Sequence, residues 1–174
     1  MPAKSSTDRY GAVAAGIHWV SALAVILMLA SGLAMDNDRA LVSAILPVHV
    51  VLGLVVGILT LFRIVWWWFF DRHPQPVAGL GVAQQWAARL VHLGLYVAIV
   101  IMVFSGVGML VLTGAAPAIF GGGALPEFSD VPPFGMHAIM SRLLIALVLG
   151  HIAAALWHHF VRRDGLIGRM RVGG

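Results

Sequence analysis

The sequence has no cysteine among its 174 residues. This absence excludes disulfide bonds, iron–sulfur clusters held by thiolates, and prosthetic groups attached through cysteine. Charge is also scarce, because only 10% of the residues are Asp, Glu, Lys or Arg, against about 25% in soluble domains. Hydrophobic residues make up 60% of the chain, and its mean hydropathy is +0.94. These values exclude an ordinary soluble fold and predict an integral membrane protein.

Four apolar runs are each long enough to cross the bilayer as a helix. They cover residues 12–35, 46–70, 87–113 and 136–161, and about 20 helical residues are enough to cross a hydrocarbon core of about 30 Å. Pro74 and Pro76 interrupt the connection between the second and third runs. We therefore predict an all-α fold, a membrane-embedded four-helix bundle that forms one transmembrane domain over residues 1–174.

The charges beside these runs predict the orientation of the bundle. One side holds most of the basic residues: Lys4, Arg9, Arg72, Arg89, Arg162, Arg163, Arg169 and Arg171. The other side holds Arg39 alone. Because basic flanking residues stay in the cytoplasm, both termini are expected there. The basic residues lie at the ends of the spans, as topology requires, so nucleic-acid binding is not indicated.

Histidines are unusually frequent in the fourth run. His137 and His151 are 14 residues apart, a separation of about 21 Å that returns to within roughly 40° of the same helix face. Ionisable residues inside a membrane are costly and usually functional. One helix would thus present two imidazoles at two depths, which is the arrangement that two stacked b-type haems require if other helices supply the opposite ligands.

The predicted topology sorts the possible partners by depth. His49 opens the second run and lies level with His137, whereas His18 and His92 both reach the level of His151. The residues alone leave that second choice open. Using His158 instead of His151 would separate the irons by about 31 Å, so we assign His158 to the membrane edge, free for substrate or protons. A zinc or copper site would gather its ligands around one metal, whereas these histidines are spread across the bilayer.

Other residues have a functional and a structural interpretation. Arg63 and Arg142 are candidates to neutralise haem propionates, although Arg63 is also placed to snorkel to the cytoplasmic surface. Gly53 and Gly57 follow His49 and leave either a groove for a flat macrocycle or a surface for helix packing. For His73, His92 and His159 a packing role is the favoured interpretation.

Several motifs together resemble the bacterial cytochrome b561 family of four-helix, di-haem, quinone-linked proteins. They are "IHW" in the first run, His49 followed 14 residues later by Arg63, the "RHPQP" loop, and "GHIAAALWHHF" in the fourth run. The resemblance covers about residues 9–165. It implies that His18 pairs with His151 on a cytoplasmic haem, that His49 pairs with His137 on an external haem, and that quinone binds near the cytoplasmic haem beside His158.

The resemblance also implies a function in the bacterial inner membrane. It is strongest to stand-alone members that pass electrons from external superoxide to ubiquinone. Arg39 and Arg142 are the candidates for a positive pocket that attracts superoxide, although the external loops also carry Asp36, Asp38, Glu127 and Asp130. The alternative functions are an electron-transfer subunit that links an external hydrogenase or dehydrogenase to the quinone pool, and a haem protein without turnover.

Overall fold

The computed structural model of the chain describes residues 2–77 and 79–171. Throughout these residues the regular structure is helical. The four long helices are α1 (Ala12–Asn37), α2 (Val42–Phe69), α3 (Val82–Thr113) and α5 (Pro133–Trp157). Five short elements accompany them: η1 (Arg39–Leu41), α4 (Ala116–Gly121), η2 (Phe128–Asp130), the π-helix η3 (His158–Arg162) and η4 (Ile167–Met170).

The long helices confirm the predicted all-α fold with four spans, because all four are long and apolar enough to cross a membrane. Three of them begin before the predicted apolar runs. Helix α2 starts at Val42 and holds Pro47 within it, and α3 starts at Val82, where the side chain of Gln84 accepts a hydrogen bond from the Gly81 N–H. Hydropathy detects the lipid-embedded part of a helix, whereas its polar ends are set by local hydrogen bonds.

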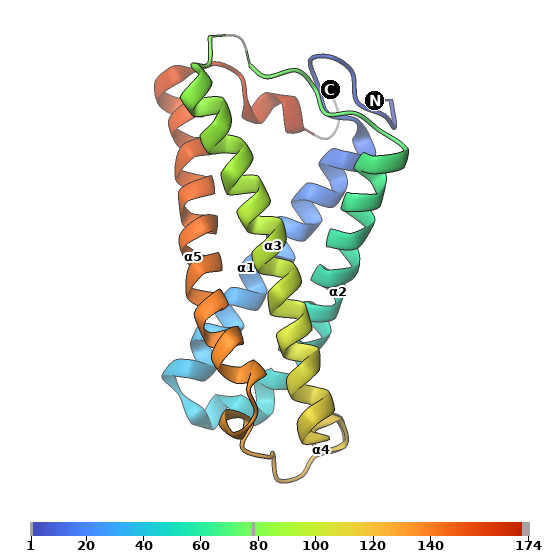
Figure 1. Cartoon of the computed structure of the whole chain (residues 1–174), viewed down its shortest axis with the longest axis vertical. Helices are drawn as coiled ribbons and strands as arrows, with labels where there is room; N and C mark the ends of the chain where they lie inside the picture. Colours follow the sequence, from blue (N-terminus) through green and yellow to red (C-terminus); the bar gives the residue numbers. More distant parts are fainter. Residues whose placement is uncertain (1, 78, 172–174) are drawn as a thin grey trace.

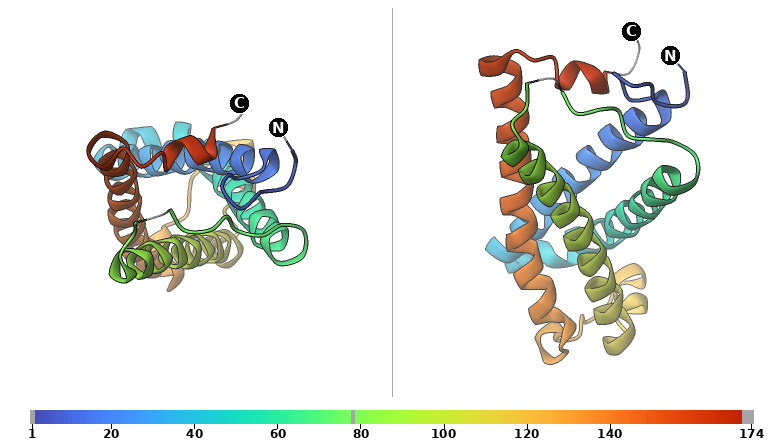
Figure 2. Two further views of the ribbon diagram at one scale, coloured as in Figure 1. Left: turned by 90° about the horizontal axis from the view of Figure 1, so that it is seen from above. Right: turned by 45° about the horizontal axis from the view of Figure 1, so that its top comes forward.

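The four long helices surround a central axis. The segment before α1 and the element η4 lie at the top of Figure 1, and we call this the terminal end. The opposite end, with the turn between α1 and α2 and the connection that contains α4, is called the loop end. Figure 2 shows α1 beside α2 and α3 beside α5, and these two antiparallel pairs also make the most extensive helix contacts.

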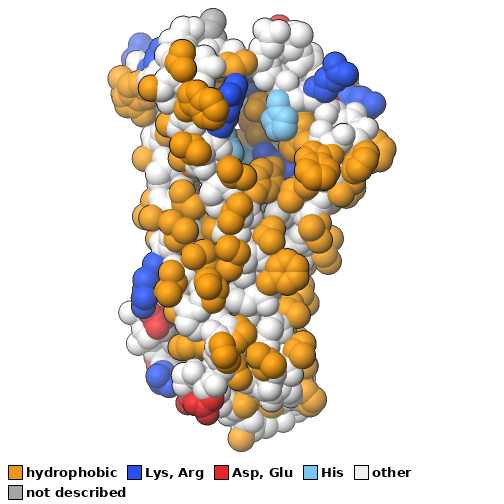
Figure 3. Space-filling model, in the orientation of Figure 1, with side chains coloured by type: hydrophobic (Ala, Val, Ile, Leu, Met, Phe, Trp, Pro, Cys, Tyr) orange, Lys and Arg blue, Asp and Glu red, His pale blue; other side chains and the backbone are white. Residues whose placement is uncertain are grey.

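An apolar core lies at mid-height in the bundle. The side chains of Val56 in α2 and Leu144 in α5 are fully buried, and Leu29, Ile99 and Val148 pack against the core clusters around both. The outer surface is also apolar (Figure 3). Since lipid solvates such a surface, the exposed Leu, Val, Phe and Trp side chains need no protein partner.

Hydrogen bonds between distant segments close the terminal end. The guanidinium of Arg169, in η4, donates to the backbone oxygens of Asp8 and Gln75 at 2.6 and 2.7 Å. The indole N–H of Trp19 donates to the Met170 carbonyl at 2.8 Å. The N-terminal segment, the 70–81 connection and η4 are therefore held together over the ends of α1 and α2.

Candidate functional site

Two histidines face each other at the loop end. His49 comes from α2 and His137 from α5, and their ring centres are 6.4 Å apart with planes inclined at 64°. Each ring is held by a serine of a neighbouring helix. Ser31 Oγ of α1 lies 2.8 Å from His49 Nδ1, and Ser105 Oγ of α3 lies 2.9 Å from His137 Nδ1.

The serines also determine which histidine nitrogen carries the proton. Ser31 Oγ donates to the Met28 carbonyl at 2.7 Å, and Ser105 Oγ donates to the Met102 carbonyl at 3.0 Å. A hydroxyl has one hydrogen, so each serine accepts a hydrogen bond from the imidazole Nδ1–H. Both Nε2 atoms are then left as lone-pair donors, which is how a second hydrogen bond prepares a histidine for a metal.

Three histidines gather at the terminal end. His151 of α5 lies between His18 of α1 and His92 of α3, with ring-centre distances of 6.2 Å to His18 and 5.3 Å to His92. Metal–imidazole bonds of about 2.0 Å place the ring centres of two opposed ligands about 6 Å apart. The His18–His151 distance agrees with this value and with the loop-end pair, and the shorter His92–His151 distance does not.

Arg63 of α2 is the charged residue of this cluster. Its Nη1 donates to His18 Nδ1 at 3.2 Å, and its guanidinium lies 5.8 Å from the centre of the Tyr96 ring. Its Nε is buried and has no hydrogen-bond partner within the described part of the chain. A buried unpaired donor on a cation is costly, so this atom indicates an anionic ligand at the terminal end.

The two helix pairs repeat the same pattern of residues. In α1 and α3 the matching residues lie 74 positions apart: His18, Met28, Ser31, Gly32 and Met35 correspond to His92, Met102, Ser105, Gly106 and Met109. In α2 and α5 the equivalent positions lie 88 residues apart: His49, Val56 and Arg63 correspond to His137, Leu144 and His151, and of these pairs the histidines alone are identical. His92 is thus the counterpart of His18, and Arg63 is the counterpart of His151.

This repeat is also the signal by which Ser31 and Ser105 were detectable in the sequence. The stretches "MLASGLAM" (28–35) and "MVFSGVGM" (102–109) share Met, Ser, Gly and Met at the same spacing. Serine is common in membrane helices as a packing residue. For that reason the two serines become functional candidates only when the fold sets them against His49 and His137.

The remaining predicted site residues lie outside the two histidine groups. Arg142 is exposed on α5, about 140° around the helix from His137, and Arg39 is exposed in η1 at the loop end. A Cβ on Gly57 would lie 3.1 Å from Val103 Cγ1, and one on Gly53 would lie 3.6 Å from Met28 Sδ. Both glycines are therefore at helix contacts, which favours the packing interpretation.

The other terminal-end histidines have separate surroundings. His158, in η3, has its Nδ1 2.5 Å from Asp164 Oδ2. His73, in the 70–81 connection, stacks on Trp67 with ring centres 3.8 Å apart. Partial burial, followed by the charge of Arg63, lowers the pKa of His73 below its usual value. His159 is exposed and contacts Phe160.

Comparisons with known proteins identify the family of the chain. The family model for prokaryotic cytochrome b561 matches residues 9–173. The chain belongs to this family. It is also 26% identical over 185 residues to a protein named cytochrome b561 homolog 2 from Escherichia coli strain K12, an alignment that covers 95% of this chain and 93% of that protein. This cytochrome b561 is accordingly a membrane electron-transfer protein that binds b-type haem.

The side chains of this cytochrome b561 fit that prosthetic group. Two opposed histidine pairs have the ring separation that a shared metal requires, and serine hydrogen bonds leave Nε2 available in one of them. The unpaired Nε of Arg63 suits a propionate. Figure 3 also shows a hollow at the terminal end, between α2 and α3, with histidine and basic side chains inside it.

Proposed function

We propose that this cytochrome b561 is a superoxide oxidase, an enzyme that takes electrons from superoxide outside the cell membrane and passes them to ubiquinone. Two superoxide anions would each lose one electron and leave as oxygen, and the two electrons with two protons would convert ubiquinone to ubiquinol. The observation that carries the proposal is the presence of opposed histidine pairs at both ends of one bundle, which suits electron transfer across the membrane.

The proposal assigns the axial positions of two b-type haems. His49 and His137 would hold the group at the loop end, and His18 and His151 would hold the group at the terminal end. When bound, these haems supply reversible one-electron chemistry. The protein supplies the ligands and the burial that set the potential. Ser31 and Ser105 would orient the loop-end ligands, and Arg63 would bind a propionate at the terminal end.

The orientation is part of the proposal. The positive-inside rule puts the terminal end, with Arg72, Arg162 and Arg169, in the cytoplasm and the loop end in the periplasm of a bacterial inner membrane. Superoxide would then arrive at the loop end, where Arg39 is the predicted attracting charge. Arg142 was predicted to share this role, although it lies about 140° around the α5 helix from His137.

His158 is assigned to quinone. It lies seven residues beyond His151, in η3 directly after α5, and about 10 Å closer to the terminal surface. An imidazole at this depth is suited to bind a quinone carbonyl and to deliver a proton to it, because histidine can act as a proton shuttle. Lipid-soluble quinone would reach it from the bilayer.

A second candidate function is that of an electron-transfer subunit for a periplasmic hydrogenase or dehydrogenase. The observation that favours it is the acidic loop end, where Asp36, Asp38, Glu127 and Asp130 outnumber Arg39. Such a surface suits a basic docking protein better than it suits an anionic substrate.

A rapid-mixing experiment distinguishes the two functions. The purified oxidised protein, free of other subunits, is mixed with superoxide while haem absorbance is followed, with and without ubiquinone. A superoxide oxidase shows fast haem reduction that is reversed by added ubiquinone. Haem that dithionite reduces but superoxide does not would reject the enzyme and favour the electron-transfer subunit.

A further inference from the structure

The end of α5 has an unusual backbone. After Trp157 the helix widens into the π-helix η3, and the next residue, Arg163, has the left-handed dihedrals φ 54° and ψ 35°. A residue other than glycine rarely adopts this conformation, and π-turns and strained residues concentrate at functional sites. The consequence here is a tight reversal that brings Asp164 back onto His158.

The two side chains form a close pair. His158 Nδ1 lies 2.5 Å from Asp164 Oδ2, and each side chain is 13% exposed. The other carboxylate oxygen, Oδ1, accepts a hydrogen bond from the Leu166 N–H at 3.2 Å. Burial acts to raise the pKa of Asp164, but the hydrogen bonds from His158 and Leu166 and the charges of His158 and Arg162 outweigh it and lower that pKa below its usual value. The carboxylate is therefore ionised at neutral pH.

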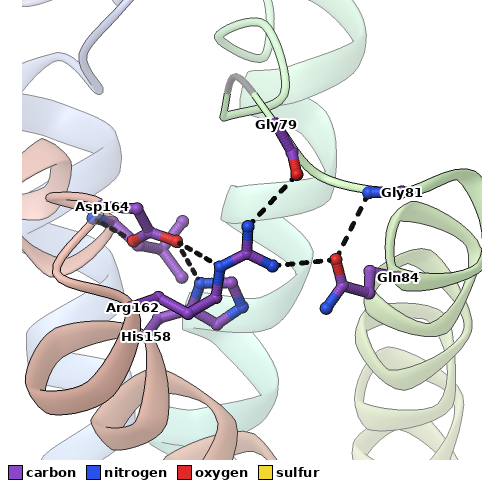
Figure 4. Close-up of polar contacts among 7 residues, drawn as sticks. Gly79, Gly81, Gln84, His158, Arg162 and Asp164 are labelled. Carbon is purple, nitrogen blue, oxygen red and sulfur yellow. Dashed lines mark hydrogen bonds and ion pairs between the residues drawn. The ribbon is translucent and has the colours of Figure 1, made fainter.

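Arg162 ties this pair to the start of α3. Its Nε lies 3.8 Å from Asp164 Oδ2, its Nη1 donates to Gln84 Oε1 at 3.1 Å, and its Nη2 donates to the Gly79 carbonyl at 3.1 Å. Figure 4 shows these contacts on one side of the carboxylate, with His158 below it and the second ring nitrogen of His158 pointing away. Through Arg162, Asp164 is thus connected both to Gly79, which precedes α3, and to Gln84 in the first turn of α3.

We propose that Asp164 is the positioning residue of the quinone site. It holds His158 with Nδ1–H on the carboxylate and Nε2 directed to a quinone carbonyl oxygen, and its negative charge lies beside the ring when both ring nitrogens carry a proton. A carboxylate that orients a histidine in this way fixes both the tautomer and the ring direction. The inference deepens the proposed function, because it rests on its quinone half.

His158 supplies the first proton of the quinol in this proposal. When quinone accepts two electrons, the Nε2–H bond of the His158 imidazolium breaks and an O–H bond forms on one carbonyl oxygen, leaving neutral imidazole. Water at the terminal end returns a proton to Nε2 and also supplies the second proton of the quinol. Asp164 stays ionised throughout and transfers no proton.

The test isolates the quinone half of the reaction. Haem-loaded protein is reduced with a stoichiometric amount of dithionite and mixed with a short-chain ubiquinone, and haem reoxidation is followed, so superoxide plays no part. We expect His158→Gln to slow reoxidation about 100-fold and Asp164→Asn to slow it about 10-fold. The loss should be in the rate at saturating quinone, with haem content and spectra unchanged. Asp164→Glu should restore most of the rate.

Two controls make the assignment specific. Asp8→Asn removes another carboxylate at the terminal end, one that is exposed, and should react like the wild type. In the double variant, Asp164→Asn should cost nothing further once His158 is glutamine, because the carboxylate acts through that ring. Independent, multiplied losses would overturn the proposal, as would a full rate in Asp164→Asn or a loss of haem from it.

The superoxide half and the quinone half of the reaction can fail separately. A wild-type protein that ubiquinone cannot reoxidise would reject the quinone half and the role of Asp164 together. A wild type that quinone reoxidises but superoxide cannot reduce would reject only the superoxide half, and the His158–Asp164 comparison would stand.

Discussion

The two ends of the bundle use the same framework for different environments. At the loop end the repeated pattern is complete, since each of the two histidines has one serine on a neighbouring helix. At the terminal end the repeat is broken, because Arg63 occupies in α2 the place that His151 occupies in α5. One end therefore holds a neutral, preorganised pair, and the other holds three histidines with a cation beside them.

This difference shows how two helix pairs with a similar residue pattern can form two distinct sites. Serine hydrogen bonds fix ring direction and tautomer without adding charge. A buried guanidinium instead adds a positive charge that favours an anionic ligand and a more reduced state of a nearby redox group. The Nη1 of Arg63 donates to His18 Nδ1, so haem binding through His18 Nε2 requires this contact to change. No such change is required at the loop end.

The largest expected effect comes from removing one ligand at each end. His137→Ala should lose the loop-end haem and His151→Ala the terminal-end haem, so each variant retains about half of the bound haem. The haem-to-protein ratio measured by absorbance checks this expectation. His159→Ala, at an exposed position, serves as the control and should retain both haems. An unchanged haem content in His151→Ala would overturn the ligand assignment.

The pair of counterparts His18 and His92 gives the next test. His18→Ala should lose the terminal-end haem, because the 6.2 Å separation of its ring centre from that of His151 fits two ligands of one metal. His92→Ala should keep it. The haem content of the two variants, measured side by side, decides between them, and the reverse result would make His92 the ligand.

The serine hydrogen bonds predict a smaller effect confined to the loop end. Ser105→Ala should weaken haem binding there about 10-fold, because His137 loses the partner that orients it. Haem transfer to a competing apoprotein measures this change. Ser141→Ala is the matched control, since Ser141 also donates to the carbonyl three residues earlier. Equal haem loss from both variants would show that Ser105 has no specific role.

Arg63 should set the difference in potential between the two ends. Arg63→Gln is expected to lower the midpoint potential of the terminal-end haem by on the order of 60 mV, about 1.4 kcal/mol for one electron. The direction follows from losing a nearby positive charge, and redox titration followed by absorbance measures it. Arg142→Gln removes an exposed arginine and should leave the potential in place. An unchanged midpoint potential in Arg63→Gln would show that the charge of Arg63 does not influence the haem.

The smallest effect concerns the closure of the terminal end. Asp71 accepts hydrogen bonds from the Ser5 N–H and hydroxyl at 3.0 and 2.8 Å. Burial acts to raise the pKa of Asp71, but these bonds and those from the Arg72 N–H and the Trp66 indole outweigh it and lower that pKa below its usual value. The stabilisation is therefore present above the unfolded-state pKa and is lost as pH falls through the folded-state pKa.

Asp71→Asn should accordingly reduce stability at neutral pH by about 1 kcal/mol. Thermal unfolding of the detergent-solubilised protein measures this difference, which should disappear in acid. Asp38→Asn, at the loop end, has a single backbone partner in Ala40 and should change stability less. A difference between wild type and Asp71→Asn that persists in acid would assign the effect to something other than the carboxylate charge.

Much of this molecule was predictable from the sequence. The four spans follow from hydropathy, and the 14-residue spacing of His137 and His151 predicts two imidazoles on one face, because helix geometry fixes both angle and rise. The positions of His18 and His92 within their runs likewise predicted that both reach the level of His151. Their similar depth, however, left two candidates for one position, which sequence reasoning resolved only through family resemblance.

The side chains that support the histidines were not predicted from the residues alone. Ser31 and Ser105 are distant in sequence from the histidines that they orient, and Asp164 meets His158 only because η3 and Arg163 reverse the chain. Arg142 was predicted to neutralise a haem propionate or to attract superoxide, whereas it lies about 140° around the α5 helix from His137 and is exposed.

The sequence by itself determined the membrane class, the four helices and the depth of each histidine, because these depend on composition and on the rise of a helix. Only the tertiary structure decided which side chains meet: serine with histidine at the loop end, Arg63 with His18 at the terminal end, and Asp164 with His158 beyond it. Such contacts depend on the rotation of each helix about its axis and on the path of its connections, which arise when the whole bundle packs.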